Sequence, residues 1–260
     1  MPITGDKSGT SPLPNARDSA GRSQLIASLA PHGILRAGIN MSNFLLVNQT
    51  DANGQPDGVS PAMARALAAE LNLELKLIPY EGPGDVADAA SRDEWDIANI
   101  ALEAERAVVI DFSPAYCEIQ ATYLTPPGSS ITGMEQVDMP GNRIAVKARS
   151  AYDLWLTRNI KQATLVRAAT LDESFERFRD ENLEVLAGLR PKLIEQQALM
   201  AGSVLFETSF MAVQQCIGCP VGKTLAANFI QHFVQQSKES GLVAELIARY
   251  EVQGRLSVAP

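Results

Sequence analysis

The chain has 260 residues, and 22 Lys and Arg against 30 Asp and Glu give it a net charge of −8. This length exceeds that of a usual single-core domain and allows two lobes or one large α/β domain. An apolar content of 46% and a charged content of 20% exclude a largely disordered chain. The excess of acidic residues argues against nucleic acid as a partner, because a phosphate backbone requires a positively charged surface.

Residues 1–30 have the composition of a flexible tail. They are rich in Ser, Pro, Gly and charged residues and contain no apolar stretch such as a secretion signal requires. For the chain as written we therefore expect a cytoplasmic protein, and a periplasmic one if the native start differs. The sequence has no run of about 18 apolar residues, so we expect no membrane insertion. Its three cysteines are too few for a disulfide framework.

From residue 34 the apolar pattern predicts strands that alternate with helices. Residues 34–39 predict a buried strand, and the Asn-Gly pair within residues 51–58 predicts a tight turn or hairpin. Ser60 and Pro61 supply an N-cap and a first helical residue, and apolar residues then recur at helical spacing up to Leu71. We expect a helix over 60–72, a strand over 73–79, a helix over 86–91 and a strand over 95–102.

The second half of the chain repeats this alternation after an extended crossing over residues 120–132. We expect strands over 143–146, 164–167, 183–187 and 212–217, and helices over 151–159 and 171–180. Gly241 separates two amphipathic helices at the C-terminal end. Alternating strands and helices indicate an α/β fold with a mainly parallel sheet.

Polar residues gather at the predicted carboxyl ends of the strands. Ligands of parallel α/β sheets bind beyond these ends. Asn40, Asn43 and Asn99 lie at such ends, and so does the turn before Arg106. These residues are therefore candidates for a binding site.

Four short segments carry a family resemblance. They are Leu-Arg-Ala-Gly at 35–38, Gly58 before the first long helix, Trp-Asp-Ile at 95–97, and the pattern E-R-x4-D-F-S-x-x-Y that runs from Glu105 to Tyr116. On these markers, residues 34–248 resemble the extracellular solute-binding proteins of family 3, the amino-acid-type receptors of ABC importers.

The resemblance implies a two-lobed α/β fold of the periplasmic-binding-protein type 2 class, with a hinged cleft between the lobes. In this family both chain ends build the first lobe, so lobe 1 would comprise residues 31–124 plus 213–260 and lobe 2 residues 125–212. Such a protein closes on a small-molecule ligand, and its partner is an ABC transporter permease. We accordingly expect a monomer with no cofactor, no metal and no catalytic residue.

The resemblance also assigns a carboxylate anchor to Arg106, the arginine of the longest motif. A guanidinium presents a rigid fork of donors that matches a carboxylate and keeps its charge. Free backbone N–H groups at a helix N-terminus of the second lobe assist in this family, and that place falls on Arg149, Ser150 and Ala151. The alternative for Arg106 is a surface salt bridge with a neighbouring glutamate, and the alternative for Arg149 is a solvated helix end.

The sequence departs from the family where a ligand ammonium would bind. Amino-acid receptors place an acidic residue just after the strand predicted at 183–187, whereas this chain has Leu189 followed by Arg190. A leucine cannot pair with an ammonium, and a desolvated cation without a partner is costly. A standard α-amino acid is therefore disfavoured unless Glu81 or Glu207 approaches. Arg190 is either a site residue or a solvated loop end.

Further departures point to a compact polar ligand. Ala101 stands where the family often has a hydroxyl group, and the aromatic walls of the first lobe fall on Asn43 and Gly82. We therefore expect a small, polar, carboxylate-bearing ligand that is amino-acid-like but is not a standard α-amino acid.

Two other functions stay open at this point. An intracellular enzyme on the same fold, similar to cyclohexadienyl dehydratase, would need a general acid or base in the cleft, and the candidates are Glu81, Glu118 and Glu207. An intracellular ligand sensor is the second alternative. The glycine-rich segment 218–224 is one residue short of a phosphate-binding loop, which argues against nucleotide binding.

Overall fold

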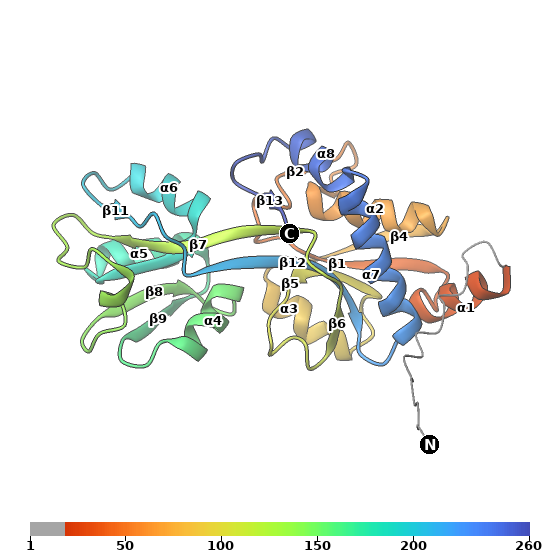
Figure 1. Cartoon of the computed structure of the whole chain (residues 1–260), viewed down its shortest axis with the longest axis horizontal. Coiled ribbons are helices and arrows are strands. Elements are labelled where there is room, and N and C mark those ends of the chain that lie inside the picture. The colour runs from red at the N-terminus through yellow and green to blue at the C-terminus, as the bar shows by residue number, and fades with distance from the viewer. Residues whose placement is uncertain (1–18) are drawn as a thin grey trace, which may run out of the picture.

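The computed structural model describes residues 19–260, which form two groups of helices and strands linked by two long strands (Figure 1). Of the tail expected over residues 1–30, residues 1–18 lie outside the described residues. From residue 19 this expectation is wrong, because a helix, α1 (Ser19–Leu29), begins there.

Helix α1 is ordered by burial of its apolar side. Leu25 and Leu29, spaced four residues apart on one face, are buried, and the helix packs on α7 (Thr224–Glu239). Burial of two leucine side chains stabilises the helix by about 3 kcal/mol or more. The largely polar composition of residues 1–30 gives no indication of this apolar pair.

The other elements follow the predicted alternation closely. The helices are α2 (Val59–Glu70), α3 (Pro83–Asp88), α4 (Ala151–Asn159), α5 (Leu171–Asp180), α6 (Arg190–Ala198) and α8 (Leu242–Arg249). The longer strands are β1 (Ile34–Asn40), β4 (Glu74–Tyr80), β5 (Ile97–Ala101), β7 (Cys117–Thr125), β8 (Arg143–Lys147), β9 (Thr164–Ala168), β10 (Val185–Leu189) and β12 (Met211–Pro220). The short strands are β2 (Gln49–Thr50), β3 (Pro56–Asp57), β6 (Ile110–Phe112), β11 (Val204–Leu205) and β13 (Ser257–Val258). The sequence pattern predicted neither α1 nor α6.

A single sheet runs through both groups in the order β4-β1-β5-β12-β7-β10-β8-β9. Strand β1 pairs in parallel with β4 and β5, and β8 pairs in parallel with β9 and β10. Between these parallel parts, β7 and β12 pair with each other in antiparallel fashion and join the two lobes (Figure 1). This is the two-lobed α/β arrangement that the resemblance implies. The predicted lobe boundaries, at 124/125 and 212/213, fall within these two strands.

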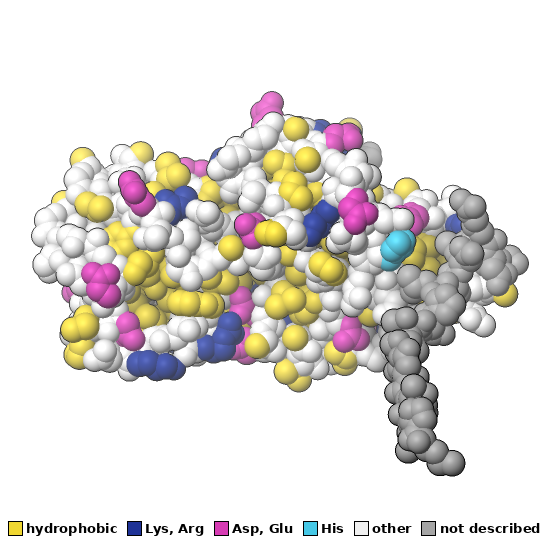
Figure 2. Space-filling model, in the orientation of Figure 1, with side chains coloured by type: hydrophobic (Ala, Val, Ile, Leu, Met, Phe, Trp, Pro, Cys, Tyr) yellow, Lys and Arg dark blue, Asp and Glu magenta, His cyan; other side chains and the backbone are white. Residues whose placement is uncertain are grey.

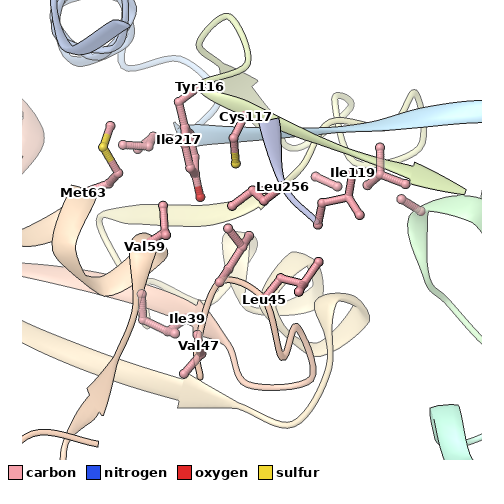
Figure 3. Close-up of a cluster of buried hydrophobic side chains, with 14 of the residues drawn as sticks. Ile39, Leu45, Val47, Val59, Met63, Tyr116, Cys117, Ile119, Ile217 and Leu256 are labelled. Atoms are coloured by element: carbon pink, nitrogen blue, oxygen red, sulfur yellow. The ribbon is translucent and has the colours of Figure 1, made fainter. Parts of the chain in front are cut away.

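Residues from both ends of the chain form the core of lobe 1. Figure 3 shows Ile39 of β1 and Met63 of α2 in one cluster with Tyr116, Ile217 of β12 and Leu256 near the C-terminus. All of these side chains are buried. Strand β13 then pairs with β7, which ties the C-terminal segment to lobe 1.

Gly58 allows a close backbone approach beside the cleft. Its φ of 144° lies in a region that favours glycine, and a Cβ atom here would lie 2.3 Å from the carbonyl oxygen of Leu46. That carbonyl accepts the N–H of Ser60 in the first turn of α2. Because it has no side chain, Gly58 allows the loop that carries Asn43 to pack against the start of α2.

No helix in residues 19–260 is long and apolar enough to cross a membrane. On the face shown in Figure 2, basic and acidic side chains are interspersed over both lobes. This distribution does not form the broad basic surface that a polyanion partner requires.

A buried carboxylate ties β1 to the residue before β5. Asp96 is fully buried and accepts hydrogen bonds from the backbone N–H of Arg36 at 2.9 Å, from its Nε at 3.1 Å and from its Nη2 at 2.7 Å. Charge-assisted bonds of this kind are about twice as strong as neutral ones. This pair, which falls in the Trp-Asp-Ile marker, fixes the register of the strands that lead to the cleft.

Replacement of Asp96 with Asn should lower the free energy of unfolding by about 2 kcal/mol, because charge-assisted hydrogen bonds to a buried carboxylate are lost. Asp180→Asn is the matched control: Asp180 pairs with Arg179 in an exposed ion pair, whose loss should leave the free energy of unfolding nearly unchanged. Urea unfolding followed by circular dichroism measures both values. Equal losses in the two variants would contradict this role of Asp96.

Candidate functional site

A partly open pocket lies where the carboxyl ends of strands from both lobes meet. Asn40 ends β1, Ala101 ends β5, Lys147 ends β8 and Leu189 ends β10, and all four line the pocket. Its volume is small, about 40 Å³. The remaining lining residues are Ser42, Asn43, Pro83, Arg106, Ser150, Ala151, Tyr152, Leu171, Val213 and Gln215.

Arg106 is a buried cation at the boundary of the two lobes. Its side chain is 3% exposed, its Nη1 donates to the carbonyl of Ala101 at 2.8 Å, and its Nη2 donates to the carbonyl of Arg149 at 3.0 Å. Desolvation lowers the pKa of Arg106 to about 10, so the group stays protonated at neutral pH. Its glutamate neighbours Glu103 and Glu105 pair with another residue, so the predicted alternative of a surface salt bridge does not form.

The first turn of α4 faces Arg106 from the other lobe. Ser150 is the N-cap, and its Oγ accepts the N–H of Asp153 at 3.1 Å. The N–H groups of Ala151 and Tyr152 lie in the first turn, where backbone donors have no acceptor within the helix. The hydroxyl of Tyr152 is buried and has no hydrogen-bond partner in the described part of the chain. This turn thus presents donors to the pocket.

Lys147 brings a second cation to the pocket. Its side chain is 8% exposed, and burial lowers its pKa, with Asp85 opposing this shift and Arg106 adding to it. None of the pocket-lining residues is Asp or Glu. The pocket therefore combines two buried cations with helix N–H donors and no carboxylate, which is the electrostatic profile of an anion site.

Most of the predicted site residues meet at this pocket. Those that line it are Asn40, Asn43, Ala101, Arg106, Ser150, Ala151 and Leu189. They come from both lobes and from widely separated parts of the sequence. Asn40, Asn43 and Arg106 follow from the strand-end rule, and Ala101, Ser150, Ala151 and Leu189 follow from the family resemblance.

The other predicted residues do not line the pocket. Asn99 is buried and does not line the pocket: it shares a face of β5 with Ala101, but it lies one step further from the strand end, and its Nδ2 donates to the carbonyl of Ser60 at 3.2 Å. Glu81 lies on a neighbouring hollow. Arg149 is half exposed and pairs with Asp88 at 2.7 Å.

Arg190 is also absent from the pocket lining. It begins α6, and its side chain donates to the carbonyl of Glu207 and, at 3.2 Å, to Oε1 of Gln120. These contacts hold the side chain against β7 and the segment before β12. Arg190 therefore does not line the pocket, and its half-buried, hydrogen-bonded side chain is not a solvated loop end either.

Several pocket residues were missed by sequence reasoning. Lys147, Tyr152 and Leu171 had a usable signal, since Lys147 directly follows the strand predicted at 143–146, and Tyr152 and Leu171 lie in the first turns of predicted helices. Gln215 had none, because it lies inside a predicted strand and not at its end.

Ion pairs between the lobes surround the pocket. Arg158 of α4 donates to Glu103 and to Glu105, each at 2.6 Å, and both glutamates follow β5 in lobe 1. Glu103 is 4% exposed, and burial raises its pKa while Arg158 lowers it. Together with the Arg149–Asp88 pair, these contacts favour the closed arrangement of the lobes.

Replacement of Arg158 with Ala should favour an open arrangement, because it leaves Glu103 without its partner between the lobes. The expected cost to the closed form is about 1–2 kcal/mol, since one partner is buried and the other is partly exposed. Small-angle X-ray scattering should show a larger radius of gyration than in the wild type. Arg179→Ala, which removes an ion pair within lobe 2, is the control. Identical scattering from both variants would contradict the role of Arg158 in holding the lobes together.

Comparisons with known proteins agree with this architecture. Residues 35–253 match the bacterial extracellular solute-binding proteins, family 3, while a comparison with curated proteins found no match. Among solved structures, the chain is similar to a Wolinella succinogenes protein complexed with lysine, at 21% identity and a TM-score of 0.70, over 86% of this chain and 97% of that chain. It is similar to a solute receptor for L-cysteine of Neisseria gonorrhoeae, at 18% identity and a TM-score of 0.71, over 90% of this chain and 99% of that one.

A third similar structure is an ancestral amino acid-binding protein described as a precursor of cyclohexadienyl dehydratase, at 20% identity and a TM-score of 0.68, over 88% of this chain and 98% of that chain. At these identities the likeness shows a shared fold. The family match, in contrast, extends over most of the sequence and includes the residues that build the pocket from both lobes. The chain therefore belongs to family 3 of the bacterial extracellular solute-binding proteins.

Proposed function

We propose that this protein binds a small carboxylate-bearing ligand between its lobes and presents it to an ABC importer. The observation that carries the proposal is the buried guanidinium of Arg106 on the pocket wall, opposite the first turn of α4. Two donor groups from different lobes converge there, so an anion held by both favours the closed form.

The contacts of Arg106 leave donors for a carboxylate. A guanidinium has five N–H donors, and two of its nitrogens donate to the carbonyl oxygens of Ala101 and Arg149. A carboxylate brings a full negative charge, whereas a carbonyl brings only a dipole, so the ligand is the stronger acceptor in a desolvated pocket. Carboxylate binding would then replace or supplement the Arg149 contact.

A standard α-amino acid fits this pocket poorly. Leu189 is 7% exposed and lines the wall at the place where the family has an acidic residue, and the pocket lining contains no Asp or Glu. An ammonium group would therefore lose its hydration without gaining a counter-charge. Glu81 and Glu207, the carboxylates that might have compensated, are not among the lining residues. The small volume adds a preference for a compact ligand.

The proposal includes the partner and the compartment. The partner is an ABC transporter permease that recognises the closed form, with the protein acting as a monomer. An importer receptor meets its ligand outside the cytoplasm, as the description of the family as extracellular indicates. The structural neighbours that bind lysine and L-cysteine support an amino-acid-like ligand size.

The catalytic alternative receives less support from the site. Glu118 accepts a hydrogen bond from Gln214 at 2.7 Å, and neither it nor Glu81 nor Glu207 lines the pocket. A general acid or base must lie within hydrogen-bond reach of the reacting group. Binding is therefore the function that the geometry supports best.

A thermal-shift screen of small carboxylates, amino acids and ureido compounds, followed by calorimetry on the hits, tests the anchor role of Arg106. Arg106→Gln should weaken binding of any hit by about thirtyfold or more, since loss of one partner of a buried charge pair costs at least about 2 kcal/mol. Arg190→Gln is the matched control, because Arg190 is an arginine of lobe 2 outside the pocket, and it should leave affinity unchanged.

A hit that binds the wild type and Arg106→Gln equally would contradict the anchor role. A standard L-amino acid that binds more tightly than every compound without an ammonium would contradict the proposed ligand class. Turnover of a hit, followed by NMR, would favour the enzyme instead.

A further inference from the structure

Lys147 stands out among the buried charged residues. Within residues 19–260, the other buried charged side chains have polar partners: Asp96 pairs with Arg36, Glu103 with Arg158, and Asp153 with Arg167, while Arg106 donates to two carbonyls. Lys147 as a whole residue is 8% exposed, and its ammonium forms no hydrogen bond or ion pair with a side chain of the described residues. A cation on a mostly buried side chain that has no protein partner is available to a ligand anion.

The position of Lys147 places its ammonium beside the pocket and across the cleft. It ends β8 in lobe 2, yet a Cβ atom at Gly82, in the loop before α3 of lobe 1, would lie 3.6 Å from Nζ of Lys147. The carboxylate closest in influence, Asp85, is half exposed, lies near Arg149 at 3.6 Å and is not part of the pocket lining. Lys147 also lines the neighbouring hollow with Glu81 and Asp85, so the protein carboxylates that face it lie outside the pocket, and none lines the pocket itself.

Neutral residues of the pocket add further donors. Oδ1 of Asn40 already accepts hydrogen bonds from the backbone N–H of Ser42 at 3.1 Å and from its hydroxyl at 2.8 Å. Oδ1 of Asn43 accepts the N–H of Leu45 at 3.3 Å. The side-chain groups that both asparagines leave for a ligand are their NH₂ donors, which suit an acceptor-rich ligand.

Two cations in one desolvated pocket also repel each other. Arg106 contributes to the lowering of the pKa of Lys147 after burial itself, which is the larger cause. A ligand with one carboxylate could neutralise only one of the two charges, and a zwitterion would add a third cation. A ligand with two anionic groups would neutralise both and keep its own charges paired.

We propose that the pocket is built for a compact dicarboxylate without an ammonium group, with one carboxylate on Arg106 and the α4 turn and the other on Lys147. This inference rests on the proposed binding function and narrows its ligand class. It makes Lys147 the residue that selects a dianion over a monocarboxylate.

Isothermal titration calorimetry with matched probes tests the inference. The dicarboxylate probes are malonate, succinate and glutarate. Two controls are derived from succinate: in succinamate an amide replaces one carboxylate, and L-aspartate is succinate with an added ammonium group. The tightest-binding dicarboxylate should bind the wild type at least about tenfold more tightly than succinamate or L-aspartate, since one lost charge pair costs about 1.4 kcal/mol or more.

Lys147→Met keeps the length of the side chain and removes its charge. This variant should lose the preference for a dicarboxylate over succinamate, and its unliganded melting temperature should equal or exceed that of the wild type, because an unpaired buried cation is removed. Lys192→Met is the control: Lys192 pairs with Asp172 outside the pocket, and its loss should leave the preference intact.

Each other outcome overturns the inference in a distinguishable way. If succinate and succinamate bind equally and both depend on Arg106, the second anion site is wrong while the proposed function stands. If L-aspartate binds more tightly than succinate, the exclusion of an ammonium is wrong. If none of these probes binds, the dicarboxylate assignment is wrong, whereas the anchor role of Arg106 is decided by the wider screen of carboxylates with Arg106→Gln.

Discussion

The guanidinium of Arg106, held between carbonyl oxygens of the two lobes, is the interaction on which the site depends. It is almost fully buried, it keeps its charge, and it contacts Ala101 at the end of β5 and Arg149 before α4. Because Arg106 bridges the lobes, its position requires that β5 and β8 end at the same place. The sheet order, with β7 and β12 between the parallel parts, produces that meeting point.

Closure and binding share the same residues. The ion pairs of Arg158 with Glu103 and Glu105 hold the helix that follows Ser150 against the turn that carries Arg106. These pairs are partly exposed, so they bias the lobes without locking them. A ligand anion between Arg106 and the α4 turn would add a desolvated and therefore stronger contact. The ion pairs thus favour the closed arrangement of the lobes, and the free energy of ligand binding would stabilise that arrangement further.

Hydrophobic periodicity predicted the alternation of elements because it is a local pattern, and the family resemblance supplied most of the pocket residues. The sequence could not predict α1, whose order depends on packing against α7 from the other end of the chain. It also misplaced Asn99 and Arg190, because tertiary contacts engage their side chains elsewhere: Asn99 donates to Ser60, and Arg190 donates to Glu207 and Gln120. Gln215 lies within β12 and not at a strand end, so the strand-end rule does not find it.

The charge of the pocket contrasts with that of the whole protein. The chain has a net charge of −8, yet the pocket collects Arg106 and Lys147 without a carboxylate. We infer that a ligand carboxylate supplies the missing negative charge at Arg106. A crystal structure of the protein with its tightest-binding ligand would decide this. A carboxylate within hydrogen-bond distance of the Arg106 guanidinium and the Ala151 N–H is the expected result, and a ligand whose carboxylate lies away from Arg106 would overturn the assignment.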